Sequence, residues 1–327
     1  MTTITITGIG GFIGLRMAQR AHALGWQVRG LDISEAAAQR ARTLGAEVII
    51  GGVNDADAVR RALEGADLVF HTAAIVEEDG PRELYERVNV EGTRTVATLA
   101  RESGVKHFVH LSSVMVYGFD YPPNVTEDGP LDGTGNIYNE TKLSSERVAM
   151  GVHDAQRMQV TVIRPGDVYG TGSVPWILRP LDLIKRGLFI LPNSGRGVIN
   201  HVHVDNLLDG VFLAIEKQAG GEVFTISDGI ATSCKEYFGH VAHMAGKRSL
   251  PALPAWLVFR LIAFSTRLWR LFGAKFPASA AATYFLMRKH TYSIEKAQRI
   301  LGYAPRITLE QGMREITEMM RSASAGR

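Results

Sequence analysis

The chain has a single cysteine, Cys234, among 327 residues, so it cannot form an internal disulfide bond. It has no low-complexity tract and no evident internal repeat, and its formal net charge is only +3. These absences exclude a disulfide-stapled secreted domain, a repeat array and a strongly charged tail. A basic and then apolar leader is also missing at the start, so we expect a cytoplasmic protein.

What the chain does have begins at its first residues, which have the pattern of a strand, a glycine turn and a helix. Isoleucine alternates with threonine over residues 3–7, and Gly8, Gly11 and Gly14 follow at intervals of three. Backbone N–H groups at a helix N-terminus bind phosphate, and glycines let the anion come close. The strict G-x-G-x-x-G fingerprint is not met, because Ile13 occupies its last position. An ordinary strand-to-helix turn is the alternative.

A second strand pattern ends at Asp32, at the distance from the glycines expected of a ribose-binding acid. A carboxylate there accepts hydrogen bonds from both ribose hydroxyls and repels a 2′-phosphate. The following Ile33 and Ser34 carry no positive charge. The cofactor predicted here is NAD rather than NADP.

Strand and helix patterns then alternate through residue 165, which predicts an α/β fold with a Rossmann-type, doubly wound parallel sheet. We assign residues 1–165 to the NAD-binding domain and residues 166–327 mainly to a smaller, partly interleaved substrate lobe. Later strands near 199–204 and 223–226 are candidates for the same sheet. Ligands of such folds bind at the carboxyl ends of the strands. The small-sided turn Thr72-Ala73-Ala74 lies at one of these ends.

Two helical segments contain candidate catalytic positions. Asn89 and Gly92 weaken an otherwise good helix without an obvious packing gain, which indicates a functional position. Tyr138 and Lys142 are four residues apart on another helix, so they share one face. A lysine ammonium beside a phenol is expected to lower the pKa of Tyr138 from about 10, and Ser113 ends a neighbouring strand. A tyrosine tuned in this way exchanges a proton with an alcohol.

Seven motifs in this order resemble the extended short-chain dehydrogenase/reductase family, and they cover about the first half of the chain: TGIGGFIG, Asp32, HTAA, NVEGT, LSSVMVYG, YNETK and RPGDVYG. The resemblance implies that Tyr138 is the general acid/base and that Lys142 holds the nicotinamide ribose and tunes Tyr138. It also implies that Ser113 orients the reacting oxygen and that Asn89 supports the site.

The same resemblance implies cofactor contacts along the whole dinucleotide. They are Gly8, Gly11, Phe12 and Ile13 at the pyrophosphate, Asp32 and Ile33 at the adenosine ribose, Val53 at the adenine, Thr72, Ala73, Ala74 and Leu111 along the edge of the sheet, and Tyr138, Lys142, Pro165 and Val168 at the nicotinamide. Many members of the family have Asp where this chain has Gly52. We expect Met115, Asp167 and Trp176 to contact the substrate.

Two features bear on the substrate. Nucleotide-sugar enzymes of the family usually have an arginine where this chain has Ile199, so a diphosphate clamp is missing there. The tail HTYSIEKAQRILGYAP loosely resembles the 3β-hydroxysteroid and sterol dehydrogenase branch. The predicted function is hydride transfer between NAD and a secondary alcohol or ketone of an apolar, steroid-like substrate. A nucleotide-sugar epimerase or dehydratase with tightly bound NAD is the alternative.

Residues 237–294 contain no acidic residue, and within them residues 254–275 have an apolar helical pattern interrupted by Arg260, Arg267 and Arg270. Three arginines argue against a membrane span. A membrane-surface helix, a lid over an apolar substrate and a helix packed on the protein itself all fit this pattern. The arginines alternate with large aliphatics, so no nucleic-acid partner is expected.

The sequence also bears on self-association and on metal binding. Small and apolar residues on the helical segments around 93–100 and 143–150 fit a homodimer or ordinary core packing. The pairs His201/His203 and His240/His243 lack further ligands at suitable spacing, so we expect no metal site.

Overall fold

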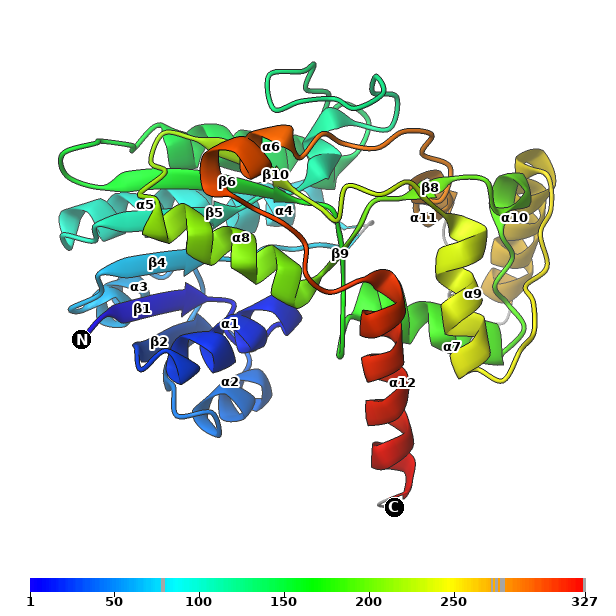
Figure 1. Ribbon diagram of the computed structural model, residues 1–327, viewed down its shortest axis with the longest axis horizontal. Helices are drawn as coiled ribbons and strands as arrows, with labels where there is room; N and C mark the ends of the chain where they lie inside the picture. The colour runs from blue at the N-terminus through cyan, green and yellow to red at the C-terminus, as the bar shows by residue number, and fades with distance from the viewer. Residues whose placement is uncertain (78–79, 272, 274–275, 277–279, 326–327) are drawn as a thin grey trace.

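The computed structural model describes residues 1–77, 80–271, 273, 276 and 280–325. Its N-terminal part is a seven-stranded sheet between two layers of helices (Figure 1). The strands are β1 (Thr3–Thr7), β2 (Gln27–Asp32), β3 (Glu47–Ile50), β4 (Leu68–His71), β5 (His107–Leu111), β6 (Gln159–Pro165) and β10 (Val223–Ile226). All neighbours in the order β10-β6-β5-β4-β1-β2-β3 run parallel. The predicted Rossmann-type fold is confirmed.

Alternation of side chains along β1 explains why helices cover both faces of the sheet. Ile4 and Ile6 are fully buried in one core, whereas the Thr5 hydroxyl donates to the Ala62 carbonyl (2.6 Å) on the other face. The first face is covered by α1 (Phe12–Ala23), α2 (Glu35–Arg42) and α8 (Val204–Glu216). The second face is covered by α3 (Ala56–Leu63), α5 (Gly92–Glu102) and α6 (Ile137–Met150).

The strand order changes direction beside β1, which pairs with β2 on one side and with β4 on the other. Thr7 and His71, at the carboxyl ends of β1 and β4, are register partners. Helices after these strands leave on opposite faces, so a crevice opens between them in folds of this kind. A ligand site is therefore expected at this point of the sheet.

The strands predicted near residues 199–204 do not join the main sheet, and that part of the prediction is wrong. β8 (Val198–Ile199) pairs with β11 (Thr232–Ser233), and β9 (His201–His203) pairs with β7 (Asp167–Tyr169). The chain leaves the sheet at Gly166, where a Cβ would lie 2.2 Å from the Asn200 carbonyl oxygen. Glycine is needed at this position because the two backbones touch.

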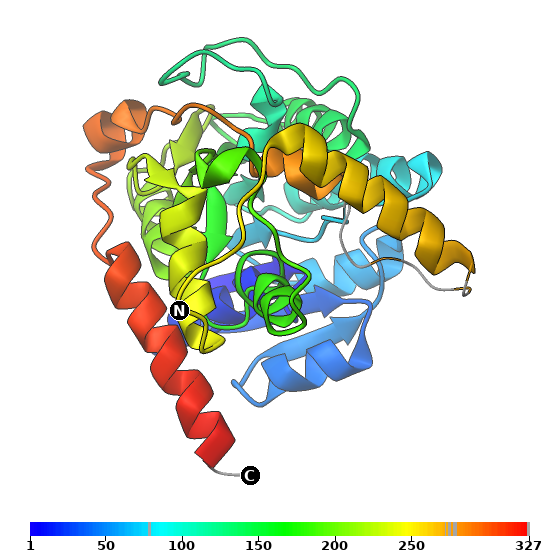
Figure 2. The same ribbon diagram turned by 90° about the vertical axis from the view of Figure 1, so that its right-hand side faces the viewer.

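The remaining elements belong either to the lobe or to segments packed around the sheet domain (Figures 1 and 2). They are α4 (Arg82–Tyr85), α7 (Arg179–Lys185), α9 (Cys234–Met244), α10 (Ala255–Leu271), α11 (Ala280–Phe285) and α12 (Leu309–Ala325), with short or π-helical segments at Glu86–Glu91, Val114–Tyr117, Val174–Leu178, Pro192–Gly195 and Ala297–Leu301. α7, α9 and α12 share an apolar core that includes Ile184, Phe238 and Met313. Among the described helices, none is both long enough and apolar enough to cross a bilayer.

Candidate active site

The first turn of α1 has backbone N–H groups without an intramolecular cap. Its N-cap residue is Gly11, no side chain accepts from the turn, and no acidic residue lies in it. By contrast, the side chain of Ser34 caps α2 and that of Asp55 caps α3. Uncapped N–H groups at the positive end of a helix dipole suit an anion such as a pyrophosphate.

The glycines hold the turn before α1 in a shape that side chains would prevent. Gly8 has a φ of +67°, and a Cβ on it would lie 3.0 Å from the Cα of Ala73. A Cβ on Gly14 would lie 2.4 Å from the Gly8 carbonyl oxygen. Gly10 is equally constrained, by the Ala37 side chain at 2.3 Å. The spacing rule missed this fourth glycine, because its neighbour comes from the next helix.

The Asp32 carboxylate lies beside this turn, at the end of β2. Its Oδ2 accepts from the Gly10 N–H (2.9 Å) and its Oδ1 from the Ser34 N–H (3.0 Å), and the side chain is only half-buried. Remaining lone pairs can therefore accept from ribose hydroxyls. The Arg40 guanidinium donates to the Gly10 carbonyl (2.8 Å). The sequence analysis missed this nearby cation because only the approach of α2 brings it to the turn.

The predicted adenine side of the cofactor site includes Ile33 and Val53, with Gly52 close to Ile33. Ile33 is 79% exposed, Val53 is buried, and a Cβ on Gly52 would meet only Ile33 and the local backbone. Gly92 now has a packing reason, since its Cβ would lie 2.4 Å from Cγ2 of Val53. The expectation that Gly92 brings no packing gain is wrong.

Asn89 links the segment after the turn Thr72-Ala73-Ala74 to α6, the helix that contains Tyr138. It lies in the π-helical segment Glu86–Glu91, where Oδ1 accepts from the Ile75 N–H (2.8 Å). Its Nδ2 donates to the Ile75 carbonyl and to the Thr141 hydroxyl, both at 3.1 Å. Thr141 is part of α6, so Asn89 fixes the chain after Thr72-Ala73-Ala74 against the helix of Tyr138. This is a positioning role.

Ser113, Tyr138 and Lys142 meet at the end of β5. The Ser113 Oγ accepts from the Met115 N–H (3.1 Å) and is hydrogen-bonded to the Tyr138 phenol. Asn136 caps α6 by accepting from the Tyr138 N–H (3.0 Å), so the helix begins directly before Tyr138. Lys142 is buried, and its Nζ donates to the Leu111 carbonyl (2.8 Å). The three predicted catalytic groups therefore share one site.

The predicted pKa of Tyr138 is wrong for the ligand-free chain. Burial raises the pKa of Tyr138 to about 12; the Ser113 hydrogen bond opposes this, and the Asp167 and Tyr85 charges add to it. Burial also lowers the pKa of Lys142 to about 8, against the charge of Glu146. The lysine ammonium is held by a carbonyl rather than by the phenol, so desolvation dominates.

The residues assigned to the substrate lie around an arginine that the sequence analysis did not include. Arg288 is fully buried and forms an ion pair with Asp167, whose Oδ2 also accepts from the Asn200 N–H (2.9 Å). Arg288 Nη1 lies 3.9 Å from the Met115 sulfur, and its guanidinium carbon lies 6.0 Å from the Trp176 ring centroid. No spacing rule finds a pair 121 residues apart.

The nicotinamide-side predictions fall on β6 and β7. Pro165 is buried at the end of β6, next to Ile226, and Val168 is half-buried in β7. Phe12 begins α1, and a Cβ on Gly170 would lie 3.2 Å from its ring. The cofactor helix therefore contacts the segment that leads into the lobe.

A buried polar network joins α6 to the strands β5 and β6 beneath it. Glu146 of α6 accepts two hydrogen bonds from Arg164 of β6 (2.9 and 2.8 Å) and one from Ser112. Arg164 also donates to the Tyr117 hydroxyl (2.9 Å). The network holds α6 at a fixed distance from β5 and β6, and the sequence analysis missed it.

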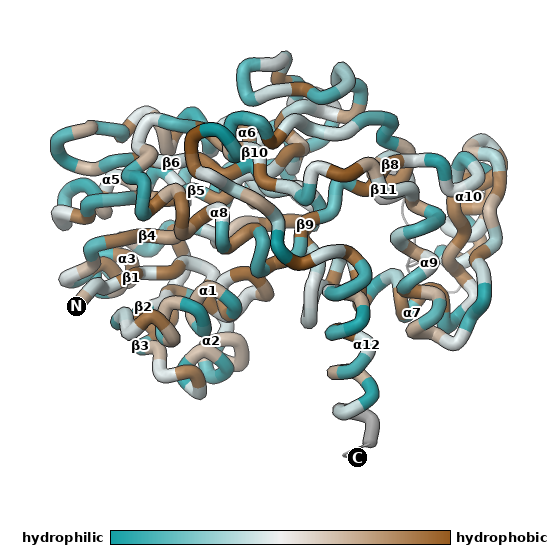
Figure 3. Tube along the Cα trace, in the orientation of Figure 1, coloured by the Kyte–Doolittle hydropathy of each residue, from teal (hydrophilic) through white to brown (hydrophobic). Residues whose placement is uncertain are grey.

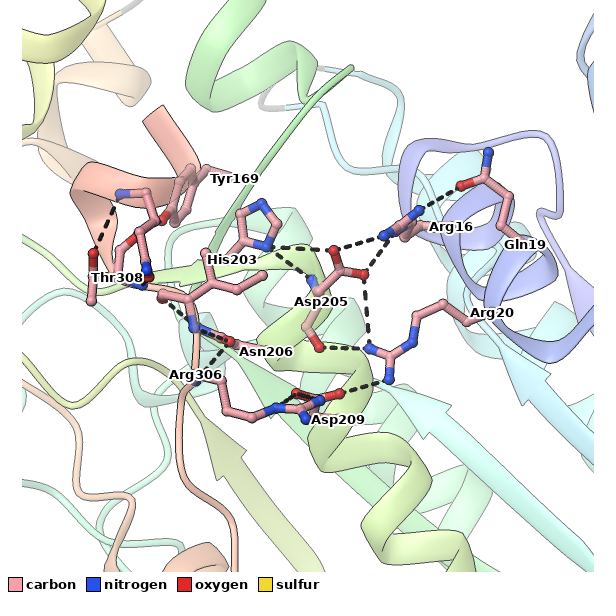
Figure 4. Close-up of polar contacts among 12 residues, drawn as sticks. Arg16, Gln19, Arg20, Tyr169, His203, Asp205, Asn206, Asp209, Arg306 and Thr308 are labelled. Atoms are coloured by element: carbon pink, nitrogen blue, oxygen red, sulfur yellow. Dashed lines mark hydrogen bonds and ion pairs between the residues drawn. The ribbon is translucent and has the colours of Figure 1, made fainter. Parts of the chain in front are cut away.

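Ion pairs join α1 to α8 and to the segment before α12 (Figure 4). Arg16 of α1 binds both carboxylate oxygens of Asp205 in α8 (2.7 and 2.9 Å). Arg20 pairs with Asp209 (2.6 Å), which also accepts from Arg306 (2.7 Å) ahead of α12. These contacts connect α1, α8 and the C-terminal segment in one network.

Two of the four histidines considered as metal ligands, His201 and His203, form hydrogen bonds. His201 contacts Asp228 (2.9 Å) and Thr232 (2.8 Å), and the His203 ring accepts from the Asp205 N–H (3.3 Å). No group of three His, Cys, Asp or Glu side chains in the described ranges could hold a metal.

A Rossmann sheet with an uncapped glycine turn, a half-buried Asp beside that turn and a Ser, Tyr and Lys set is typical of a dinucleotide-dependent enzyme. The model of the NAD dependent epimerase/dehydratase family matches residues 4–227. The chain belongs to this family and is an NAD-dependent enzyme of the extended short-chain dehydrogenase/reductase type.

Two curated relatives match nearly the whole chain. A 4-hydroxy-2-methyl-3-oxo-4-farnesyl-3,4-dihydroquinoline-1-oxide ketoreductase of Stigmatella aurantiaca is 30% identical and covers 94% of this chain and 93% of its own. A 3-beta-hydroxysteroid dehydrogenase of Mycolicibacterium neoaurum is 29% identical, with 95% and 89% covered.

Solved structures share the fold at lower identity. A UDP-glucose 4-epimerase from Thermotoga maritima superposes with a TM-score of 0.80 at 22% identity, covering 98% of this chain and 99% of its own. MoeE5 in complex with UDP-glucose and NAD has a TM-score of 0.76 at 24% identity, with 98% and 99% covered.

Proposed function

We propose that the chain transfers hydride between NAD and a secondary alcohol or ketone of an apolar substrate, with Tyr138 as the acid/base. The observation that carries this proposal is the meeting of Ser113, Tyr138 and Lys142 near the buried Arg288–Asp167 ion pair, whose charges neutralise each other. The two curated relatives are named for reactions on a farnesylated quinoline ketone and on a steroid alcohol, which supports the choice of an apolar substrate.

The chain's own residues divide the work at the substrate oxygen. Bound NAD supplies the hydride acceptor or donor at C4 of its nicotinamide ring. Ser113 and Tyr138 hold the substrate oxygen by hydrogen bonds, which fixes the carbon for transfer. With a pKa of about 12, the Tyr138 phenol is protonated at neutral pH and suits proton donation to a ketone. In the reverse direction Tyr138 first loses its proton to solvent, and the phenolate then accepts the alcohol proton as the hydride leaves the carbon. The Lys142 ammonium assists by stabilising the phenolate.

A nucleotide-sugar substrate is less well supported by the pocket. Ile199, at the position of the expected diphosphate clamp, is completely buried in the lobe core and pairs with Thr232. Arg288 is already bound to Asp167, so a diphosphate would have to break a buried ion pair before using this cation. Both features favour an uncharged substrate.

The test is the appearance of NADH with a hydroxysteroid, a simple secondary alcohol and a UDP-sugar offered separately. We expect NADH release with the apolar alcohols. Conversion of the UDP-sugar without NADH release would instead establish the epimerase or dehydratase function.

The Tyr138→Phe variant tests the assignment of the proton carrier. Loss of general acid/base catalysis lowers kcat by roughly 10²–10⁴-fold, whereas NAD binding measured by calorimetry should stay unchanged. Tyr284→Phe is the matched control, because Tyr284 is half exposed and lies on α11 rather than on α6. Full activity of Tyr138→Phe would remove the proposed role.

A further inference from the structure

We propose that α10 binds the surface of an anionic membrane through its solvent-exposed side. We call this side the α10 face and define it by six residues: Trp256, Arg260, Phe264, Arg267, Leu268 and Arg270. The helix lies on the outer edge of the lobe, far from the main sheet (Figures 1 and 2). Arginines bind the lipid phosphates of such a membrane, and the apolar side chains contact the acyl layer beneath them.

The α10 face exposes side chains that proteins normally bury. Trp256 is 62% exposed, Phe264 is 66% exposed and Leu271, at the end of the helix, is 81% exposed. Along its 17 residues, only Val258 is fully buried. The hydropathy trace accordingly shows apolar segments along this outlying helix (Figure 3). An exposed apolar patch of this kind marks an interaction surface.

Helical geometry divides this face into two edges. At 100° per residue, Arg260, Arg267 and Arg270 fall along one edge around Trp256, and Phe264 and Leu268 fall along the other. Arg260 lies over the Trp256 ring, 5.7 Å from its centroid. The two hydroxyl residues of the helix, Ser265 and Thr266, are on its less exposed side. A helix at an ordinary water interface would show the opposite distribution.

Charge complementarity selects an anionic lipid surface as the occupant. Residues 237–294 contain no acidic residue, so the arginines of the α10 face have no carboxylate on their own helix. A second copy docked through the same face would set three arginines against three arginines. Lipid phosphates pair with the arginines, while Trp256, Phe264 and Leu268 enter the boundary between headgroups and acyl chains.

The less exposed side of α10, which includes Phe259, is connected to the candidate active site by aromatic contacts. The Phe259 ring lies 5.2 Å from Tyr284, Tyr284 lies 5.9 Å from Phe119, and Phe119 lies 5.2 Å from Phe285. The Arg288 guanidinium carbon is in turn 5.9 Å from the Phe285 ring centroid. Membrane docking would therefore bring the substrate side of the enzyme towards the bilayer. Only this last consequence rests on the proposed function.

The experiment is co-sedimentation of the full-length chain with vesicles of phosphatidylcholine, with and without phosphatidylglycerol. We expect binding to the anionic vesicles that decreases with salt. A basic residue near an anionic surface contributes about a fivefold change in partitioning, so removing three charges weakens binding on the order of a hundredfold. The variant R260E/R267E/R270E should lose at least this much. The control R60E/R61E/R157E makes the same change in net charge on exposed positions outside α10.

A second measurement keeps the proposal testable if that variant folds poorly. Brominated lipids in the anionic vesicles should quench the fluorescence of the wild type more strongly than that of Trp256→Phe. F264S/L268S should lower partitioning without changing net charge. NADH release with a water-soluble secondary alcohol should be unaffected in Trp256→Phe and in F264S/L268S. This activity assay therefore distinguishes failure of membrane binding from failure of the proposed function.

Three results would overturn the proposal. They are no sedimentation of the wild type with anionic vesicles, equal loss in the control variant, and α10 variants that change the oligomeric mass by light scattering while vesicle binding persists. The last result would assign the α10 face to contact between two copies.

Discussion

Low pH should decrease the free energy of unfolding through His71. This residue ends β4 and directly precedes the turn Thr72-Ala73-Ala74. Thr93 donates its hydroxyl proton to the Asn89 carbonyl (2.7 Å), so it can only accept from His71 Nε2 (2.9 Å). His71 Nδ1 then accepts from the Thr7 hydroxyl (2.8 Å), which in turn accepts from the Ala73 N–H (3.3 Å). These contacts require a neutral imidazole protonated on Nε2. A second ring proton, on Nδ1 of His71, would point towards the hydroxyl proton of Thr7.

The magnitude follows from the pKa. Burial, reinforced by the charge of Lys142, lowers the pKa of His71 to about 3 from 6.5. Above pH 6.5 this shift has no effect, because His71 is neutral in both states. Below pH 6.5 the unfolded chain binds a proton that the native chain does not, so stability falls with pH down to about pH 3. At pH 5 the loss is about 2 kcal/mol, from about 1.4 kcal/mol for each pH unit. His107, with its pKa lowered to about 4 by burial, adds a similar loss.

The assay is urea denaturation at pH 7 and pH 5, followed by tryptophan fluorescence. The free energy of unfolding of the wild type should fall by about 2 kcal/mol more between these pH values than that of His71→Gln. His22→Gln is the control, because His22 is exposed. Carboxylates that titrate over the same interval contribute equally to all three proteins. An identical pH dependence for the wild type and His71→Gln would refute the argument.

Three further predictions concern the cofactor and the pocket. Asp32→Ala should weaken NAD binding and gain use of NADP, because Arg40 is left to meet the 2′-phosphate; kinetics with both cofactors test this, and the double variant with Arg40→Ala should lose the gain. Gly14→Ala should abolish NAD binding measured by calorimetry, since its Cβ would lie 2.4 Å from a backbone oxygen, and unchanged affinity would contradict this cradle. Arg288→Met should cost about 3–5 kcal/mol of stability in denaturation experiments by leaving the Asp167 charge buried and unpaired. Adding Asp167→Asn should recover most of that loss, and no recovery would speak against the pair as the cause.

The parts of the fold that could be predicted from sequence are those set by local periodicity. The β1 strand, the glycine turn and the Asn136 cap of α6 depend on neighbouring residues, and all three are present. Gly10 and Arg288 could not be found in this way. Gly10 is constrained by Ala37 of the next helix, and Arg288 by a carboxylate far away in the chain. Both needs arise only when distant elements pack together.

The pKa of Tyr138 shows a different limit of sequence reasoning. A spacing of four residues correctly places Tyr138 and Lys142 on one helix face, but it contains no information on desolvation. The structure directs the Lys142 amine to the Leu111 carbonyl and buries the phenol, and the pKa of Tyr138 rises as a result. Face and proximity are local properties, whereas the protonation equilibrium depends on everything packed around the site.

The Asp167–Arg288 pair connects these points, because it acts on both the proton carrier and the substrate side. The Asp167 charge raises the pKa of Tyr138, and Arg288 compensates that charge within the same buried region. Arg288 in turn contacts Phe285, and Phe285 is the last ring in the series of aromatic contacts that begins at α10. A charged substrate group entering here would disturb the ion pair and the phenol together, whereas an apolar group leaves both as they are. The proposed apolar substrate and the proposed membrane contact of the α10 face are therefore consistent with each other.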